Sequence, residues 1–173
     1  MKPFLLTVFT VGLFCCLLML SGCGSQAPKR LQVGDSAPSF ARQDISGTVI
    51  SLEHFRGKAV VLRFFLPDCK FCKADTKVFN DFYQRYHAKG LQIIYIDTSP
   101  EGNHQVDKFV KDLNIQFPVI HDTTGEIAAD YLIKVVPQAV ILSPDLKIKG
   151  AILGGVSEAE LNQLLLPYLN GKG

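Results

Sequence analysis

The chain has 173 residues, of which 47% are hydrophobic and 20% are charged, and its formal net charge is +2. This length suits one domain with a substantial core, and the composition argues against a largely disordered chain. The charges are spread along the sequence without a basic run, which excludes the electrostatic footprint of a nucleic-acid-binding protein.

In residues 1–22 a positive charge, an apolar region and small residues follow one another as in a secretory signal peptide. Lys2 precedes an apolar stretch over residues 4–20, and a serine and a glycine then supply the small residues of a cleavage site. The sequence Leu-Ser-Gly-Cys at residues 20–23 resembles a bacterial lipobox, which implies cleavage before Cys23 and a lipid on its sulfur. An uncleaved membrane anchor is the alternative, because the apolar run is almost long enough to span a bilayer. Both interpretations place the following domain outside the cytoplasm.

The remaining chain divides into a tether and a folded domain. Residues 23–30 hold the expected lipidated cysteine and a short flexible tether, and residues 31–173 form the domain. Two of the five cysteines fall within the signal peptide and a third is Cys23, so only Cys69 and Cys72 remain in the domain. In an oxidising compartment such a pair forms a disulfide or cycles between dithiol and disulfide. A bridge that closes so small a loop adds little stability through chain entropy, which favours the redox role.

Hydrophobic periodicity and turn residues predict alternating strands and helices through the domain. An irregular entry segment over residues 31–40 precedes a small hairpin over residues 41–52. The further elements expected in chain order are a strand at 58–66, a helix at 70–87, a strand at 91–97, a helix around 106–113, a short strand at 117–120, a short helix ending at 131, strands at 138–142 and 147–153, and a helix at 157–169. This alternation predicts an α/β fold whose sheet is covered by helices on both faces.

Cys69 and Cys72 lie where a strand ending at Leu66 gives way to a helix that starts near Lys70. Unpaired N–H groups and the dipole at a helix N-terminus favour a thiolate at Cys69, and the thiolate is the nucleophile. Cys72 follows about one turn later on the same side, where it can attack a mixed disulfide and release the partner. The predicted chemistry is thiol-disulfide exchange, which needs no cofactor.

The chain resembles the thioredoxin-like thiol-disulfide oxidoreductases of the TlpA/ResA type, within the AhpC/TSA-redoxin family. The segments VGDSAPSF and SLEHFRGKAVVLRFF resemble the opening of that family, the Cys-x-x-Cys follows at the expected place, and VVPQAVILSPDLKIKGAILGG resembles its closing segment. The resemblance covers about residues 32–169. It implies a thioredoxin fold, with a central mixed β-sheet flanked by helices and an N-terminal β-hairpin extension.

The same resemblance implies roles for residues outside the cysteine pair. It implies a cis peptide bond between Val136 and Pro137 beside the disulfide, with the Val136 backbone available to an extended substrate segment. Without the resemblance, Pro137 is an ordinary proline at the start of a strand. Asp75 stands where ResA-like members carry a glutamate that assists proton transfer, about one helical turn from Cys72. The alternative for Asp75 is a solvent-facing residue in the first turn of the helix.

The sequence departs from the family pattern around the cysteines. Pro67 and an aspartate replace the aromatic residue usual before the first cysteine, and Lys70 and Phe71 lie between the cysteines, with no proline. Because these positions surround the nucleophile, Pro67, Lys70 and Phe71 are predicted to meet the substrate. The departures should alter the surface that faces the partner and the redox potential of the pair.

A third departure is Arg63, on the central strand where thioredoxins have a buried acid. A buried arginine needs a partner, and Asp75 and Asp97 are both conceivable. Otherwise the guanidinium group reaches the surface along its aliphatic stem.

Two other functions use a similar fold. A peroxiredoxin nucleophile normally follows a Pro-x-x-x-Thr-x-x-Cys pattern, whereas Pro67 is two residues before Cys69 and no threonine intervenes. A copper chaperone of the Sco type uses two cysteines and a distant histidine, for which His121 is the one roughly placed candidate. That family spaces its cysteines by three residues rather than two. No metal site is predicted, because two thiols fall short of the four ligands of structural zinc.

The sequence therefore predicts an extracytoplasmic thiol-disulfide oxidoreductase anchored to a membrane by its lipid. The resemblance implies a reductive role on protein disulfides, such as those of apocytochrome c, with electrons from a membrane thiol donor of the DsbD/CcdA type. We expect a monomer on the periplasmic side of the inner or outer membrane, without a cofactor, a metal or a nucleic-acid partner.

Overall fold

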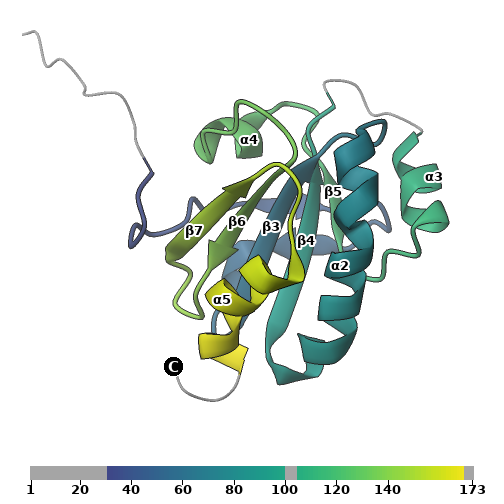
Figure 1. Cartoon of the computed structure of the whole chain (residues 1–173). Coiled ribbons are helices and arrows are strands. Elements are labelled where there is room, and N and C mark those ends of the chain that lie inside the picture. The colour runs from purple at the N-terminus through teal and green to yellow at the C-terminus, as the bar shows by residue number, and fades with distance from the viewer. Residues whose placement is uncertain (1–30, 100–104, 170–173) are drawn as a thin grey trace, which may run out of the picture. The chain divides into compact units, whose positions relative to one another are not determined.

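The computed structural model describes residues 31–99 and 105–169 (Figure 1). The predicted signal peptide, the lipidation site at Cys23 and the tether lie outside the described residues, as do residues 100–104 and 170–173. Within the two described ranges, no helix is long and apolar enough to cross a membrane.

The elements follow the predicted order closely. They are β1 (Ala41–Gln43), β2 (Val49–Ser51), η1 (Leu52–Phe55), β3 (Ala59–Phe65), α2 (Lys70–Tyr86), η2 (His87–Lys89), β4 (Leu91–Asp97), α3 (Gln105–Asp112), β5 (Val119–His121), α4 (Glu126–Asp130), β6 (Gln138–Leu142), β7 (Ile148–Leu153) and α5 (Glu158–Leu169). The fifth strand begins two residues later than predicted. Phe117 packs into the core without joining the ladder, and Pro118 has no N–H to donate.

Five strands form one mixed sheet in the order β5-β4-β3-β6-β7. Strand β3 is central: it runs parallel to β4 and antiparallel to β6. Strands β4 and β5 are parallel, and β6 and β7 are antiparallel. Strands β1 and β2 form the separate antiparallel hairpin that the sequence predicts. Because parallel strands carry their carboxyl ends to one edge, the segments after β3, β4 and β5 meet there.

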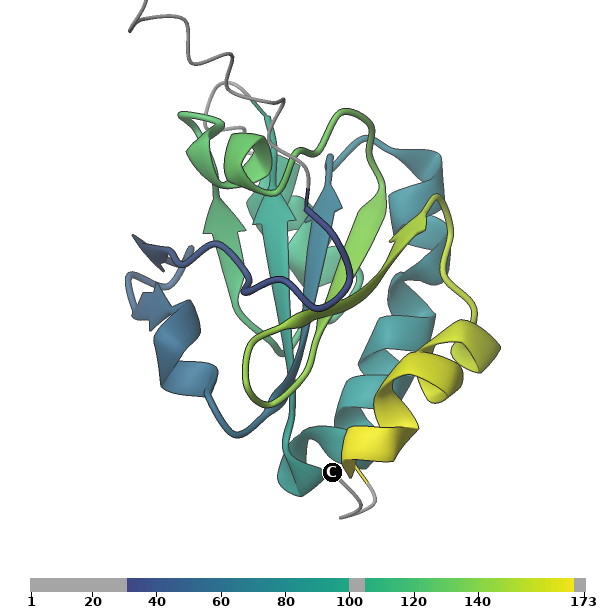
Figure 2. The same ribbon diagram turned by 90° about the vertical axis from the view of Figure 1, so that its left-hand side faces the viewer.

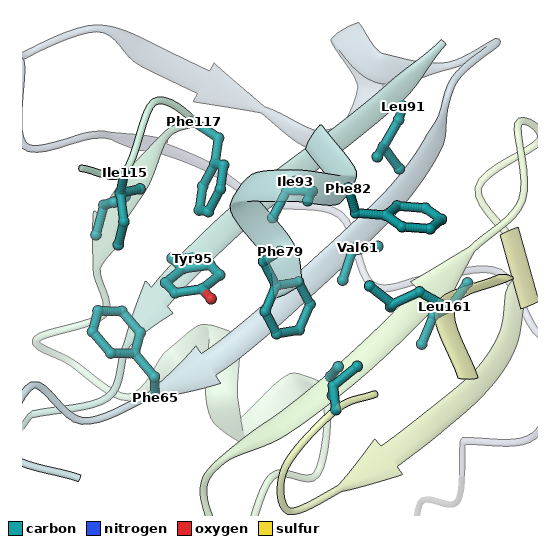
Figure 3. Close-up of a cluster of buried hydrophobic side chains, with 14 of the residues drawn as sticks. Val61, Phe65, Phe79, Phe82, Leu91, Ile93, Tyr95, Ile115, Phe117 and Leu161 are labelled. Atoms are coloured by element: carbon teal, nitrogen blue, oxygen red, sulfur yellow. The ribbon is translucent and has the colours of Figure 1, made fainter. Parts of the chain in front are cut away.

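Helices α2 and α5 lie on one side of this sheet, and the hairpin and α4 lie on the other (Figure 2). A cluster of apolar side chains packs on each face, which confirms the predicted α/β class. All seven residues of β3 are buried, and successive side chains point to opposite faces. Val61 and Phe65 join the cluster beneath α2, α3 and α5 (Figure 3). Leu62 and Phe64 join the second cluster, which includes residues of the hairpin and α4. Burial on both faces explains why this strand is an almost continuous apolar run, and Arg63 interrupts it.

Candidate active site

Helix α2 begins directly after the cysteine that the sequence predicts to be the nucleophile. Cys69 is the N-cap residue, with extended backbone angles (φ −68°, ψ 118°), and the Cys72 N–H donates to its sulfur over 3.2 Å. A serine or aspartate oxygen usually accepts this bond at an N-cap. The Cys69 sulfur therefore lies where the helix dipole and free N–H groups favour a negative charge.

The two cysteines differ sharply in accessibility. Cys69 is partly exposed, whereas Cys72 is 1% exposed, and both are free thiols. Burial, with a smaller contribution from the neighbouring Cys69, raises the pKa of the Cys72 thiol to about 12, although the positive charge of Arg63 acts in the opposite direction. At neutral pH Cys72 is thus a protonated thiol, and it must lose its proton to a base before it can act as a nucleophile.

This difference gives an expected labelling pattern. We define a two-thiol variant of the full chain in which Cys15, Cys16 and Cys23 are serine, so that Cys69 and Cys72 are its only thiols. At pH 8, iodoacetamide should modify Cys72 at least about 100-fold more slowly in the folded protein than in urea, because few Cys72 side chains are thiolates. Mass spectrometry of the separated cysteine peptides measures both rates. Equal folded and unfolded rates for Cys72 would contradict its assignment as the buried thiol.

A buried ion pair lies behind the dithiol. Asp75 is 6% exposed and Arg63 is 0% exposed. One carboxyl oxygen of Asp75, Oδ2, accepts from Arg63 Nη2 and, over 2.9 Å, from the Val156 N–H. Arg63 Nη1 donates to the Gly154 carbonyl oxygen over 3.0 Å. The pair thus joins β3, α2 and the segment between β7 and α5. Asp75 is therefore not solvent-facing, and Arg63 is partnered by Asp75 rather than by Asp97.

The second carboxyl oxygen of Asp75 is chemically available. Among the described residues, Oδ1 is buried and has no hydrogen-bond partner. Burial raises the pKa of Asp75 above its ordinary value, while Arg63 and the Val156 N–H act in the opposite direction. A carboxyl group with a raised pKa and one unoccupied oxygen can bind a proton and return it.

Tyr95 and Thr76, to which no motif in the sequence assigns a role, complete this polar layer. The Tyr95 hydroxyl and Thr76 Oγ1 are 3.3 Å apart, and Thr76 donates to the Cys72 carbonyl oxygen over 2.7 Å. Tyr95 is opposite Arg63 in the strand register, and its ring packs edge-on against Phe79 (Figure 3). The sequence does show a tyrosine within the otherwise apolar run at residues 91–97. Only the register of β3 and β4 shows that this tyrosine lies beside Arg63.

The predicted substrate-facing residues lie at different depths. The peptide bond between Val136 and Pro137 is cis, as the resemblance implies. Phe71 is 70% exposed and Lys70 is also exposed, so both are accessible to a partner. Pro67 is buried by comparison, although it contributes to the wall of a pocket that α3 also lines. Contact between these residues and a substrate stays a prediction.

His121 takes part in a different polar group. Its Nδ1 lies 3.1 Å from Asp97 Oδ2, and Asp97 Oδ1 accepts from the backbone and hydroxyl of Ser99. Within residues 31–99 and 105–169, no group of three or more histidine, cysteine, aspartate or glutamate side chains could hold a metal ion.

A dithiol whose outer sulfur caps the helix that follows the central strand of a mixed sheet defines a thiol-disulfide oxidoreductase. The family model of the AhpC/TSA family matches residues 33–151. The chain belongs to this family.

Proteins similar to this chain are named as thiol-disulfide oxidoreductases. The chain is 33% identical over 137 residues to thiol-disulfide oxidoreductase ResA of Bacillus thuringiensis subsp. konkukian, and this alignment covers 79% of each protein. It is 32% identical to the ResA of Bacillus anthracis over 157 residues, or 86% of this chain and 90% of that protein. A solved thiol:disulfide interchange protein of the thioredoxin family from Chlorobium tepidum matches with a TM-score of 0.72 and 22% identity, over 83% of this chain and 99% of that one. These similarities confirm the predicted thioredoxin fold and the predicted oxidoreductase class.

Proposed function

We propose that this oxidoreductase works outside the cytoplasm, where it reduces disulfides of protein substrates and is held to a membrane by a lipid on Cys23. The observation that carries the proposal is the asymmetry of the dithiol. Cys69 is partly exposed at a helix N-terminus, and Cys72 is buried directly behind it. This asymmetry suits a first attack on a large partner by one sulfur and an internal second attack by the other.

Each step of the proposed reaction has a residue to perform it. The Cys69 thiolate attacks a substrate disulfide, which forms a mixed disulfide and releases one substrate thiolate. Asp75 takes the proton of the Cys72 thiol, and the Cys72 thiolate attacks the Cys69 sulfur. The Cys69–Cys72 disulfide forms, and the second substrate thiolate leaves and is protonated. Two electrons pass from the enzyme to the substrate, and an external dithiol must return them.

The location and partners follow from the N-terminal sequence and from the family resemblance. Residues 1–22 have the pattern of a signal peptide, and Cys23 stands at the lipidation position. Val136 and Pro137 would shape the substrate-docking surface with Pro67, Lys70 and Phe71. An apocytochrome c with an oxidised cysteine pair is the proposed substrate. A membrane thiol donor of the DsbD/CcdA type is the proposed source of electrons.

The midpoint potential of the Cys69–Cys72 couple tests this proposal. The two-thiol variant in detergent is equilibrated in graded mixtures of thiol and disulfide, and its free thiols are counted after alkylation. A reversible two-electron couple below about −220 mV is expected, because a dedicated reductant must donate electrons to protein disulfides. A potential above about −180 mV would contradict the reductive role and indicate disulfide formation or shuffling. The absence of any reversible couple would contradict thiol exchange itself.

A further inference from the structure

We propose that Arg63 is a positioning residue for the resolving step: its guanidinium group holds Asp75 as a carboxylate, with one oxygen free to take the Cys72 proton. This inference rests on the proposed function, because it assigns a residue that controls the second attack. Arg63 touches neither the substrate nor the reacting sulfur atoms in this mechanism. It acts through Asp75.

Two donors fix one oxygen of Asp75 and leave the other unoccupied. Arg63 Nη2 and the Val156 N–H both donate to Oδ2, whereas Oδ1 has no partner among the described residues. Cys72 and Asp75 are three residues apart on α2 and both are buried, and side chains at this spacing have Cβ atoms about 5–6 Å apart on one helix face. Among the carboxyl groups of α2, that of Asp75 is the nearest in sequence to Cys72, and its Oδ1 is the oxygen without a partner.

The guanidinium group is itself held in place. Its Nη1 donates to the Gly154 carbonyl oxygen over 3.0 Å, and its central carbon lies 5.2 Å from the centroid of the Phe79 ring. Gly154 has a φ of +91°, a conformation that favours glycine, and this turn presents its carbonyl oxygen to Arg63. A buried cation with two fixed contacts is a preorganised charge that does not move during the reaction.

The groups around the Asp75 carboxyl come from each neighbouring element. Strand β3 contributes Arg63, β4 contributes Tyr95, and the segment before α5 contributes the Val156 backbone N–H. The charge of Arg63 also acts on Cys72 of α2. Arg63 is the only cation in this group. Its removal would leave the buried carboxyl without an opposite charge beside it, so the carboxyl would hold its proton to a higher pH.

The proton and electron balance makes the consequence specific to one step. During resolution the Cys72 S–H bond breaks, its proton goes to Asp75, and the electron pair left on sulfur forms the bond to Cys69. The Cys69–substrate bond breaks at the same time, and its electron pair leaves with the substrate sulfur. If Asp75 already carries a proton, it cannot accept another, and resolution stalls. The first attack by Cys69 does not use this proton and should be unaffected.

Single-turnover kinetics can isolate the resolving step. The reduced two-thiol variant is mixed with glutathione disulfide, quenched with acid at set times, and weighed by mass spectrometry to count the mixed disulfide with glutathione. We expect the pH at which resolution reaches half its plateau rate to be about 1–3 pH units higher in Arg63→Met. The rate of mixed-disulfide formation should change less than about twofold.

Further variants separate this role from a structural one. Arg63→Lys keeps the cation and should bring the half-plateau pH back to within about half a pH unit of the parent value, because the opposite charge stays beside the carboxyl. Asp75→Asn should resolve slowly at every pH, and adding Arg63→Met to it should shift the profile much less than in the parent, because only the direct effect of Arg63 on the Cys72 thiol remains. Arg85→Met is the matched control, since Arg85 forms an ion pair between α2 and α5, with Glu158 over 2.7 Å, at the exposed far end of α2.

The outcomes distinguish the inference from the proposed function. A parent protein that forms no mixed disulfide contradicts the proposed function. A parent protein that cycles normally, with an unshifted profile in folded Arg63→Met, overturns only the inference. A shift of equal size in the Asp75→Asn background overturns the inference as well.

If circular dichroism shows that Arg63→Met does not fold, Arg63→Gln replaces it with the same expected shift. If neither folds, a shift larger than about one pH unit in Arg63→Lys overturns the inference, and a smaller one supports it.

Discussion

Cys72→Ser is expected to stop exchange at the mixed disulfide. Cys72 is the proposed resolving thiol, and Cys69 and Cys72 are the two thiols of the two-thiol variant. The attack of Cys72 on Cys69 is intramolecular, between residues at the N-cap and in the first turn of one helix, and replacing it by attack from dissolved thiol should lengthen the lifetime of the mixed disulfide at least about 100-fold. Mass spectrometry after reaction with glutathione disulfide measures that lifetime.

The matched control is Cys69→Ser. It removes the partly exposed sulfur and leaves Cys72, which is buried and protonated at neutral pH. This variant should form less than about 1% as much mixed disulfide as Cys72→Ser in the same time, because the buried thiol has a low thiolate fraction. Equal trapping by the two variants would show that the sulfurs are interchangeable, which contradicts the assignment of Cys69 as the attacker.

The order and type of the elements follow from local patterns that a single sequence displays. The apolar run at residues 58–66 and the helical spacing at 70–87 predict β3 and α2 to within one residue at each end. Both signals are local: a strand buried on two faces is apolar throughout, and an amphipathic helix repeats every 3.6 residues. The N-cap position of Cys69 follows from the same boundary.

The partner of Arg63 is not a local property, and the sequence leaves it open between Asp75 and Asp97. The decision depends on strand register. Asp97 is opposite His121 in the β4–β5 ladder, and it accepts hydrogen bonds from Ser99 in the turn that follows. Its carboxyl oxygens are therefore engaged away from Arg63. Asp75 has no such local partners, and the packing of α2 on β3 brings its carboxyl group to the guanidinium group.

The contact between Arg63 and Gly154 is harder still to predict, because 91 residues separate them. The contact depends on the order of strands in the sheet, in which β6 and then β7 lie next to β3. This order brings the end of β7 towards α2. The sequence predicts a strand that ends at residue 153, directly before Gly154. Which group approaches this glycine is decided only when the sheet is assembled.

Arg63→Met alone is expected to destabilise the reduced protein by about 3–5 kcal/mol at pH 8, because it leaves the Asp75 charge buried without its cation. The double variant Arg63→Met/Asp75→Asn should lose at least about 2 kcal/mol less than the sum of the two single variants, since neither charge is then stranded. Urea unfolding of the two-thiol variant and its derivatives measures these energies. The exposed Arg85–Glu158 pair is the matched control, and its coupling energy should be about 0.2–1 kcal/mol.

The pH dependence of this loss identifies its cause. Burial raises the pKa of Asp75 in the folded state, and removing Arg63 raises it further. In the pH range between the unfolded and folded pKa values, the folded Arg63→Met protein holds a proton that the unfolded chain has released, so its stability falls as the pH rises. Arg63→Met should therefore be closest to the parent protein near pH 4 and furthest from it at pH 8. A loss that is equal at both pH values would mean that Arg63 stabilises the fold through packing against Phe79 and its bond to Gly154, and not through the charge of Asp75.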